Sequence, residues 1–191
     1  MGYQEEKQRQ LDIRYLKMAT VWAENSYCVR RQVGALIVKN KMIISDGYNG
    51  TPSGFENVCE DEAGRTKPYV LHAEANAITK VAKSSNSSEG ATLYVTSSPC
   101  IECAKLIIQS GIRRVVFCDD YHSSDGIELL RRVGIEVVKG SFKMQKPLGD
   151  VDERILEING GTNIIILDSV PTHVKCETVK KMNRGKEVES V

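Results

Sequence analysis

Two short motifs constrain this chain more than any other feature of its sequence. They are His72-Ala73-Glu74 and Pro99-Cys100-Ile101-Glu102-Cys103, and each stands at the start of a predicted helix that follows a loop. One imidazole and two thiolates suit a tetrahedral zinc ion and leave its fourth position open for water. We therefore predict a zinc site whose protein ligands are His72, Cys100 and Cys103.

The spacing of the two cysteines supports this prediction. Cys100 and Cys103 lie one helical turn apart, so their sulfurs can point the same way. A helix N-terminus also favours the thiolate form, which is the form that binds metal. Two alternatives stay open. A redox pair would leave His72 and Glu74 unexplained, and a structural zinc site would need a fourth protein ligand.

Glu74 is the predicted catalytic residue, because it follows His72 by two positions. A His-x-Glu motif combined with Pro-Cys-x-x-Cys is the signature of zinc deaminases, in which zinc activates a water and the glutamate carries protons. Glu74 would take a proton from that water and deliver protons to N3 and to the departing amine of a cytosine ring. The alternative is an ordinary acidic residue at a helix start.

Hydrophobic periodicity predicts an N-terminal helix, a β-hairpin, and then helices and strands that mostly alternate. The alternation indicates a mixed sheet with helices on both faces. A long loop rich in Gly, Pro and Asn covers residues 49–68, and such loops are often functional. The predicted helices cover 6–25, 73–83, 101–110 and 126–133, and the predicted strands 33–38, 42–48, 92–96, 114–118 and 135–138.

We expect one domain over residues 1–140 that carries both motifs, followed by a C-terminal extension over residues 141–191. The extension contains no recognisable motif. Residues 163–167 could form one more strand, and the polar residues from about 180 onward are predicted to be disordered.

Composition limits the classes of partner. Lys and Arg total 26 against 25 Asp and Glu, a net charge of +1, which disfavours a dedicated nucleic-acid binder. No apolar run reaches membrane-spanning length, and the first residues lack the apolar region of a secretory signal. We therefore predict a cytoplasmic protein without a membrane partner, whose six cysteines are ligands or buried thiols rather than disulfides.

Over roughly residues 10–140 the chain resembles the deoxycytidylate (dCMP) deaminase family of the cytidine deaminase-like superfamily. Four segments carry the resemblance, and the one beginning Gly47-Tyr48-Asn49-Gly50 is the most discriminating. They are Val33-Gly34-Ala35, Gly47-Tyr48-Asn49-Gly50-Thr51-Pro52-Ser53-Gly54, His72-Ala73-Glu74-Ala75-Asn76-Ala77-Ile78 and Ser98-Pro99-Cys100-Ile101-Glu102-Cys103-Ala104-Lys105.

This resemblance implies an α/β fold with three layers, α/β/α, around a mixed five-stranded sheet. It also implies that Asn49 and Ala73 bind the substrate, with Asn49 on the sugar, and that Tyr121 lies close to the nucleotide phosphate. Arg31, or its neighbour Arg30, would bind the phosphate, since a guanidinium binds phosphate through two hydrogen bonds. The alternatives are that Asn49 is a turn residue and that the two arginines form a solvated surface pair.

Further expectations follow from the same resemblance. They are a homo-oligomer, hexamer or dimer, activation by dCTP with Mg²⁺, inhibition by dTTP, and an effector site shaped by the loop over residues 47–54. Some relatives hold a second, structural zinc, and Cys28 and Cys59 look like two of its ligands. Because the segment before His72 offers no further ligand, we predict one zinc per chain and ordinary thiols at Cys28, Cys59, Cys118 and Cys176.

The predicted activity is hydrolysis of dCMP to dUMP and ammonia, which feeds thymidylate synthesis. A deaminase of nucleic acid would need a basic groove lined by aromatic residues, and the chain has only 6% aromatics. A deaminase of free cytidine or another base would differ only in its phosphate contacts. A non-catalytic nucleotide sensor would have no need of Glu74.

Overall fold

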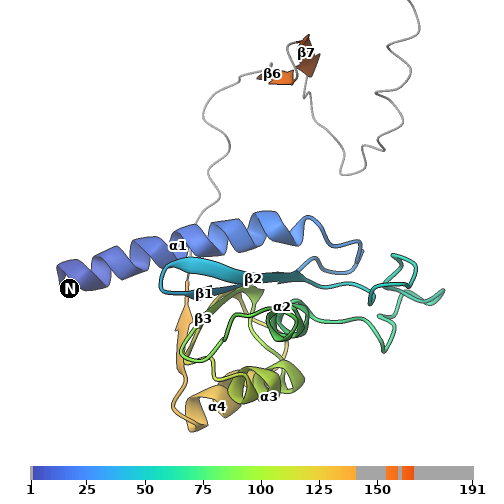
Figure 1. The fold of residues 1–191 in the computed structure, drawn as a ribbon. Helices are drawn as coiled ribbons and strands as arrows, with labels where there is room; N and C mark the ends of the chain where they lie inside the picture. Colours follow the sequence, from blue (N-terminus) through green and yellow to red (C-terminus); the bar gives the residue numbers. More distant parts are fainter. Residues whose placement is uncertain (1, 141–153, 159–160, 166–191) are drawn as a thin grey trace, which may run out of the picture. The chain divides into compact units, whose positions relative to one another are not determined.

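A computed structural model of the protein describes residues 2–140, 154–158 and 161–165 (Figure 1). The chain divides into two compact units, Met1–Lys143 and Met144–Val191, which we describe separately. No described helix combines the length and the apolar character needed to cross a bilayer.

The first unit contains four helices and five strands, and every element predicted for it is present with its ends moved by a few residues at most. The helices are α1 (Tyr3–Ala23), α2 (Ala73–Ala82), α3 (Ile101–Gln109) and α4 (Asp125–Arg132). The strands are β1 (Gly34–Lys39), β2 (Met42–Tyr48), β3 (Thr92–Ser97), β4 (Arg114–Asp119) and β5 (Glu136–Lys139).

The five strands form one sheet in the order β2-β1-β3-β4-β5, which confirms the predicted mixed sheet. Strand β1 runs antiparallel to both β2 and β3, while β3, β4 and β5 are mutually parallel. Asn40 and Lys41 join β1 to β2 with positive φ angles of 50° and 64°, the conformation of a tight hairpin turn.

Helices cover both faces of the sheet (Figure 1). Helix α1 packs on one face, where Leu16 and Ala19 lie in a cluster with Leu36 and Tyr94. Helices α2, α3 and α4 pack on the other face, over the larger apolar cluster. Gly47 lets α2 approach β2 closely, since a Cβ there would overlap the backbone carbonyl of Ala73. This contact fixes the start of α2.

The segment between β2 and α2 folds back on itself through two isolated bridges, Gly50 with Leu71 and Glu60 with Thr66. Cys59 in this segment forms a disulfide with Cys28, with a sulfur–sulfur distance of 2.02 Å. The prediction that Cys28 and Cys59 are ordinary thiols is therefore wrong. That prediction rested on the expected compartment, whereas the path of the loop brings the two residues together.

Two further cysteines, Cys118 and Cys176, were also predicted to be ordinary thiols. Cys118 is a free thiol, and burial raises its pKa to about 11. Cys176 lies outside the described residues.

The second unit contains β6 (Arg154–Ile158) and β7 (Gly161–Ile165), which pair antiparallel to each other. The strand predicted over 163–167 overlaps β7, which begins two residues earlier; 166–167 and the residues from 180 onward lie outside the described part of the chain. Strand β6 was not predicted from the sequence.

Candidate active site

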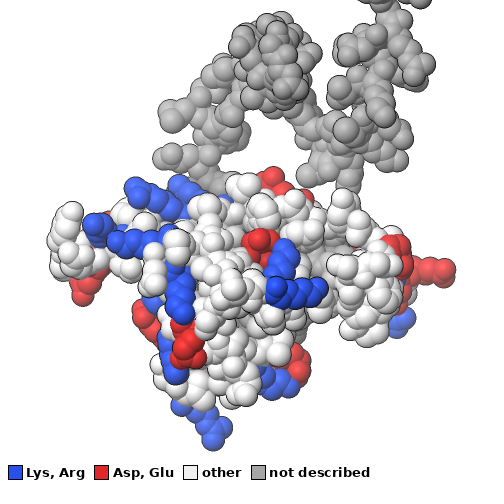
Figure 2. Space-filling model, in the orientation of Figure 1, with Lys and Arg blue, Asp and Glu red and all other residues white. Residues whose placement is uncertain are grey.

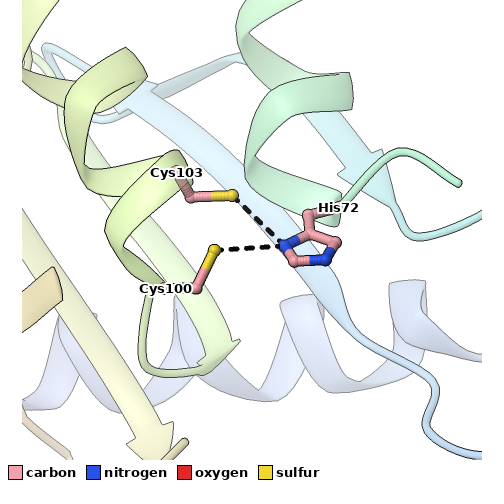
Figure 3. Close-up of side chains that lie close together, drawn as sticks. All are labelled: His72, Cys100 and Cys103. Carbon is pink, nitrogen blue, oxygen red and sulfur yellow. Dashed lines mark hydrogen bonds between the residues drawn. The ribbon is translucent and has the colours of Figure 1, made fainter. Parts of the chain in front are cut away.

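The predicted metal ligands come together from the N-terminal ends of two helices (Figure 3). His72 is the N-cap residue of α2, Cys100 is the N-cap residue of α3, and Cys103 lies in the first turn of α3. The Nδ1 atom of His72 lies 3.4 Å from the Sγ atoms of both cysteines. Within the described residues, these three form the one cluster of His, Cys, Asp or Glu with the spacing of a metal site.

The donor set and its dimensions fit zinc. Zinc–sulfur bonds of about 2.3 Å and zinc–nitrogen bonds of about 2.0 Å in a tetrahedron place nitrogen and sulfur about 3.5 Å apart. The observed nitrogen–sulfur distances of 3.4 Å match this value. Three protein donors leave one position of the tetrahedron for another ligand, as in catalytic zinc sites.

The electrostatics of the cluster favour a thiolate at Cys100. Hydrogen bonds from Cys103 and then from His72 lower the pKa of Cys100 to about 3, despite its partial burial. The same contact raises the pKa of Cys103, which keeps the shared proton. The hydrogen bond to Cys100 raises the pKa of His72. The thiolate of Cys100 is the form that binds a metal cation, so the cluster is suited to a divalent ion.

Glu74 lies in the first turn of α2 and is only 4% exposed. Burial raises the pKa of its carboxyl group, because the charged form loses contact with water. A raised pKa makes the ionised carboxyl group a stronger proton acceptor, which suits a general acid–base that first takes a proton and later returns it.

A cavity of about 340 Å³ joins Glu74 and the metal cluster to the predicted substrate residues. Cys103 is buried and is the one predicted site residue that does not line it. The lining comprises Cys28, Arg30, Arg31, Val33, Asn49, Glu60, Thr66, Val70, His72, Ala73, Glu74, Ser97, Ser98, Cys100, Tyr121 and His122.

The Asn49 side chain braces the segment that carries the two arginines. Its Oδ1 accepts a 2.7 Å hydrogen bond from the backbone N–H of Val33, and its Nδ2 donates a 2.8 Å bond to the carbonyl of Arg31. The second Nδ2 hydrogen is available for a ligand. Asn49 is not among the residues with positive φ, so the turn alternative does not hold, and its sugar-binding role stays a prediction.

Arg30 and Arg31 line the cavity, and the guanidinium of each has one polar side-chain contact, at 3.2 Å and 3.6 Å respectively. Arg31 Nη2 lies 3.6 Å from Asp119 Oδ2, and both side chains are well exposed. Arg30 Nη1 donates to Thr66 Oγ1 at 3.2 Å. The backbone N–H of Arg30 donates to Glu60, which ties this wall to the loop.

Tyr121 lies in the cavity wall after β4. Its backbone N–H donates a 2.7 Å hydrogen bond to Ser98 Oγ, and its ring packs against His122 with centroids 3.9 Å apart. Sequence reasoning missed Ser98, His122 and Glu60. His122 adjoins Tyr121 in the sequence and could have been found, whereas the partners of Ser98 and Glu60 are remote in sequence and left no local signal.

Comparisons with known proteins agree with this geometry. The family model described as "Cytidine and deoxycytidylate deaminase zinc-binding region" matches residues 9–119. The deoxycytidylate deaminase of Enterobacteria phage T4 is 37% identical over 165 residues, covering 64% of this chain and 86% of that protein. The human deoxycytidylate deaminase is 42% identical over 120 residues, covering 58% of this chain and 66% of that protein.

A solved structure is also similar. The dCMP deaminase of cyanophage S-TIM5, in complex with dCMP and dUMP, superposes with a TM-score of 0.66 at 45% identity. The match covers 73% of this chain and 98% of that chain, which confirms the predicted cytidine deaminase-like fold. The family model describes a zinc-binding region, and His72, Cys100 and Cys103 all lie within the residues that it matches. The chain belongs to the cytidine and deoxycytidylate deaminase family.

Proposed function

We propose that this protein is a zinc-dependent deaminase that converts dCMP to dUMP and ammonia. One observation carries the proposal: the cavity that Glu74 and the metal cluster line also has Arg30 and Arg31 in its wall. A single cavity thus contains Glu74, which can transfer protons, and two arginines that can bind an anionic phosphate. The phage relative bound to dCMP and dUMP supports a nucleotide substrate of this kind.

The residues of the chain supply the acid–base chemistry. His72, Cys100 and Cys103 would hold the zinc, which when bound supplies Lewis-acid activation of a water molecule. Glu74 would take one proton from the attacking water and give it to N3 as the C4–O bond forms. It would then pass the second proton from that oxygen to the exocyclic amine, which leaves as ammonia when the C4–N bond breaks. The buried position of Glu74 keeps solvent from competing for these protons.

The remaining lining residues would select the nucleotide. The guanidinium of Arg31, with Arg30 beside it, would bind the phosphate, and Tyr121 would lie next to it. Asn49 would donate its second Nδ2 hydrogen to the sugar, and Ala73 would contact the ring at the start of α2. Basic and acidic side chains are intermixed on the face shown in Figure 2, so that face carries no continuous basic surface for a nucleic-acid strand.

The proposal extends to regulation and assembly. A second cavity of about 600 Å³ borders the loop residues Gly50–Phe55, and Lys80 and Lys83 lie in its wall. Its size and its cations would suit a dCTP effector with Mg²⁺, or inhibitory dTTP. We further propose a cytoplasmic homo-oligomer, hexamer or dimer, with catalysis in residues 1–140 and an extension at 141–191.

Ammonia release by the purified protein tests the main proposal. The substrates would be dCMP, CMP, deoxycytidine and single-stranded DNA, with Glu74→Ala as the inactive control and zinc content measured alongside. We expect activity on dCMP that the substitution abolishes. Activity on deoxycytidine or DNA instead would keep the zinc chemistry and overturn the phosphate-binding role of Arg31 and Tyr121.

A further inference from the structure

Ser97 is a buried serine whose hydroxyl has no protein partner. It ends β3 and is 5% exposed, and it lines the 340 Å³ cavity. In the part of the chain that the structure describes, its Oγ is the one buried side-chain oxygen or nitrogen without a hydrogen bond. Such groups cost free energy and are rare, so this hydroxyl calls for an explanation.

The hydroxyls on either side of Ser97 are both used within the protein. Thr96 Oγ1 accepts a hydrogen bond from the backbone N–H of Gly34, and Ser98 Oγ accepts one from the backbone N–H of Tyr121. These two bonds hold the backbone at Gly34 and at Tyr121 in place. Ser97 alone among the three is left without such a role.

The alternation of β3 places Ser97 on the face that carries the active site. Leu93 and Val95 belong to the apolar cluster beneath α2 and α3, and Ser97 is next in the same alternating series. The N-terminal ends of α2 and α3 hold Glu74 and the metal ligands. Ser97 therefore lies on the side of the sheet that carries Glu74 and the metal ligands, where the reacting edge of a base would lie.

A serine hydroxyl suits that edge. Its oxygen is covered in this structure, but rotation about the Cα–Cβ bond takes it through three staggered positions without moving the backbone. It can accept a hydrogen bond from an amino group and donate one to a carbonyl oxygen. An aminopyrimidine presents an amino group at this edge, and its deaminated product presents a carbonyl oxygen at the same position.

We propose that Ser97 contacts the substrate, with its hydroxyl accepting a hydrogen bond from the exocyclic amino group and donating one to the carbonyl of the product. This inference rests on the proposed function, since it needs an aminopyrimidine nucleotide in the cavity. It makes Ser97 a residue that orients the ring edge toward Glu74.

The test compares Ser97→Ala with Ser45→Ala. Ser45 is also buried, but its Oγ donates a 2.7 Å hydrogen bond to the carbonyl of Ala77 and it does not line the cavity. For Ser97→Ala we expect kcat/KM for dCMP to fall about tenfold and the Kd of dUMP to rise by a similar factor, the effect of one lost hydrogen bond. The melting temperature of the ligand-free protein should not fall, because no protein contact is lost. Ser45→Ala should show the reverse, a lower melting temperature with unchanged kcat/KM.

The possible outcomes separate the two proposals. An unchanged kcat/KM and dUMP affinity in Ser97→Ala, or a melting temperature lowered as in Ser45→Ala, would overturn the role of Ser97 while leaving the deaminase function intact. A wild-type protein that neither deaminates dCMP nor binds dUMP would overturn both. If Ser97→Ala does not fold, Ser97→Cys preserves the shape, bonds only weakly, and should change kcat/KM in the same direction.

Discussion

The guanidinium of Arg114 donates two hydrogen bonds of 2.8 Å to the two carboxylate oxygens of Asp12 and so fastens α1 to β4. Tyr94 of β3 donates a third bond of 2.8 Å to Asp12 Oδ1. The pair is largely buried, with side-chain exposures of 16% for Arg114 and 9% for Asp12. These bonds join three elements, and removing the carboxylate would leave a buried charge with fewer partners.

We predict that Asp12→Asn lowers the free energy of unfolding at neutral pH by about 3 kcal/mol, the cost of breaking a buried ion pair. Denaturant titration would measure the loss. Glu6→Gln is the matched control, because it removes an exposed ion pair with Arg9 on the same helix and should change stability little. An equal loss in both variants would contradict the role given to Asp12.

The same carboxylate predicts a pH dependence. Burial raises the pKa of the Asp12 carboxyl group, but hydrogen bonds from Arg114, Gln8 and Tyr94 lower it by a larger amount. The pKa in the folded state therefore lies below the ordinary value of 3.8. The folded state therefore releases this proton more readily than the unfolded state. The stabilising contribution is fully present above pH 3.8 and is lost as the pH falls through the folded-state pKa. The stability gap between wild type and Asp12→Asn should narrow at acidic pH, as unfolding curves recorded at successively lower pH from neutrality would reveal.

The disulfide supplies a second stability prediction. Cys28 and Cys59 are 31 residues apart in sequence, and closing a loop of that length stabilises the folded state by about 3–4 kcal/mol in the chain-entropy account. A dithiol reductant, or the variant Cys59→Ser, should lower the melting temperature accordingly. Cys118→Ser tests specificity, since this free thiol makes no covalent contact. If reductant leaves the melting temperature unchanged, the disulfide does not form in solution.

Metal removal gives a further prediction. A chelator, or Cys103→Ser, should remove the zinc and abolish deamination, because His72 and one sulfur give too few protein donors. Metal analysis would read out the zinc content. Glu74 is not one of the three clustered donors, so Glu74→Gln should retain zinc while losing activity. A loss of zinc in Glu74→Gln would contradict the division of roles between ligands and proton carrier.

The sequence predicted those features that depend on neighbouring residues. The helices, strands and metal ligands follow from short-range periodicity and from motif spacing, such as the single helical turn between Cys100 and Cys103. The Cys28–Cys59 bond and the contact between Ser98 and Tyr121 depend on how loops return to the sheet. No motif marks these partners, as one marks His72 and Cys100, so these contacts emerge only in the folded chain.

The raised pKa of Glu74 leads to a final prediction that links stability to catalysis. A carboxyl group whose pKa is raised by burial binds its proton more tightly in the folded state than in the unfolded state. Its presence therefore destabilises the folded protein as the pH rises above the ordinary carboxyl value of 4.5. In the zinc-free form, Glu74→Gln should melt at a higher temperature than wild type at neutral pH. In the zinc-loaded form, its deamination rate should fall by about 10²–10⁴-fold. Thermal denaturation at pH 4 and pH 7 (about the unfolded-state pKa and well above it) would show the difference between the proteins growing with pH. A difference independent of pH would mean that ionisation of Glu74 does not limit stability, and the buried carboxylate would then have to be compensated within the cavity.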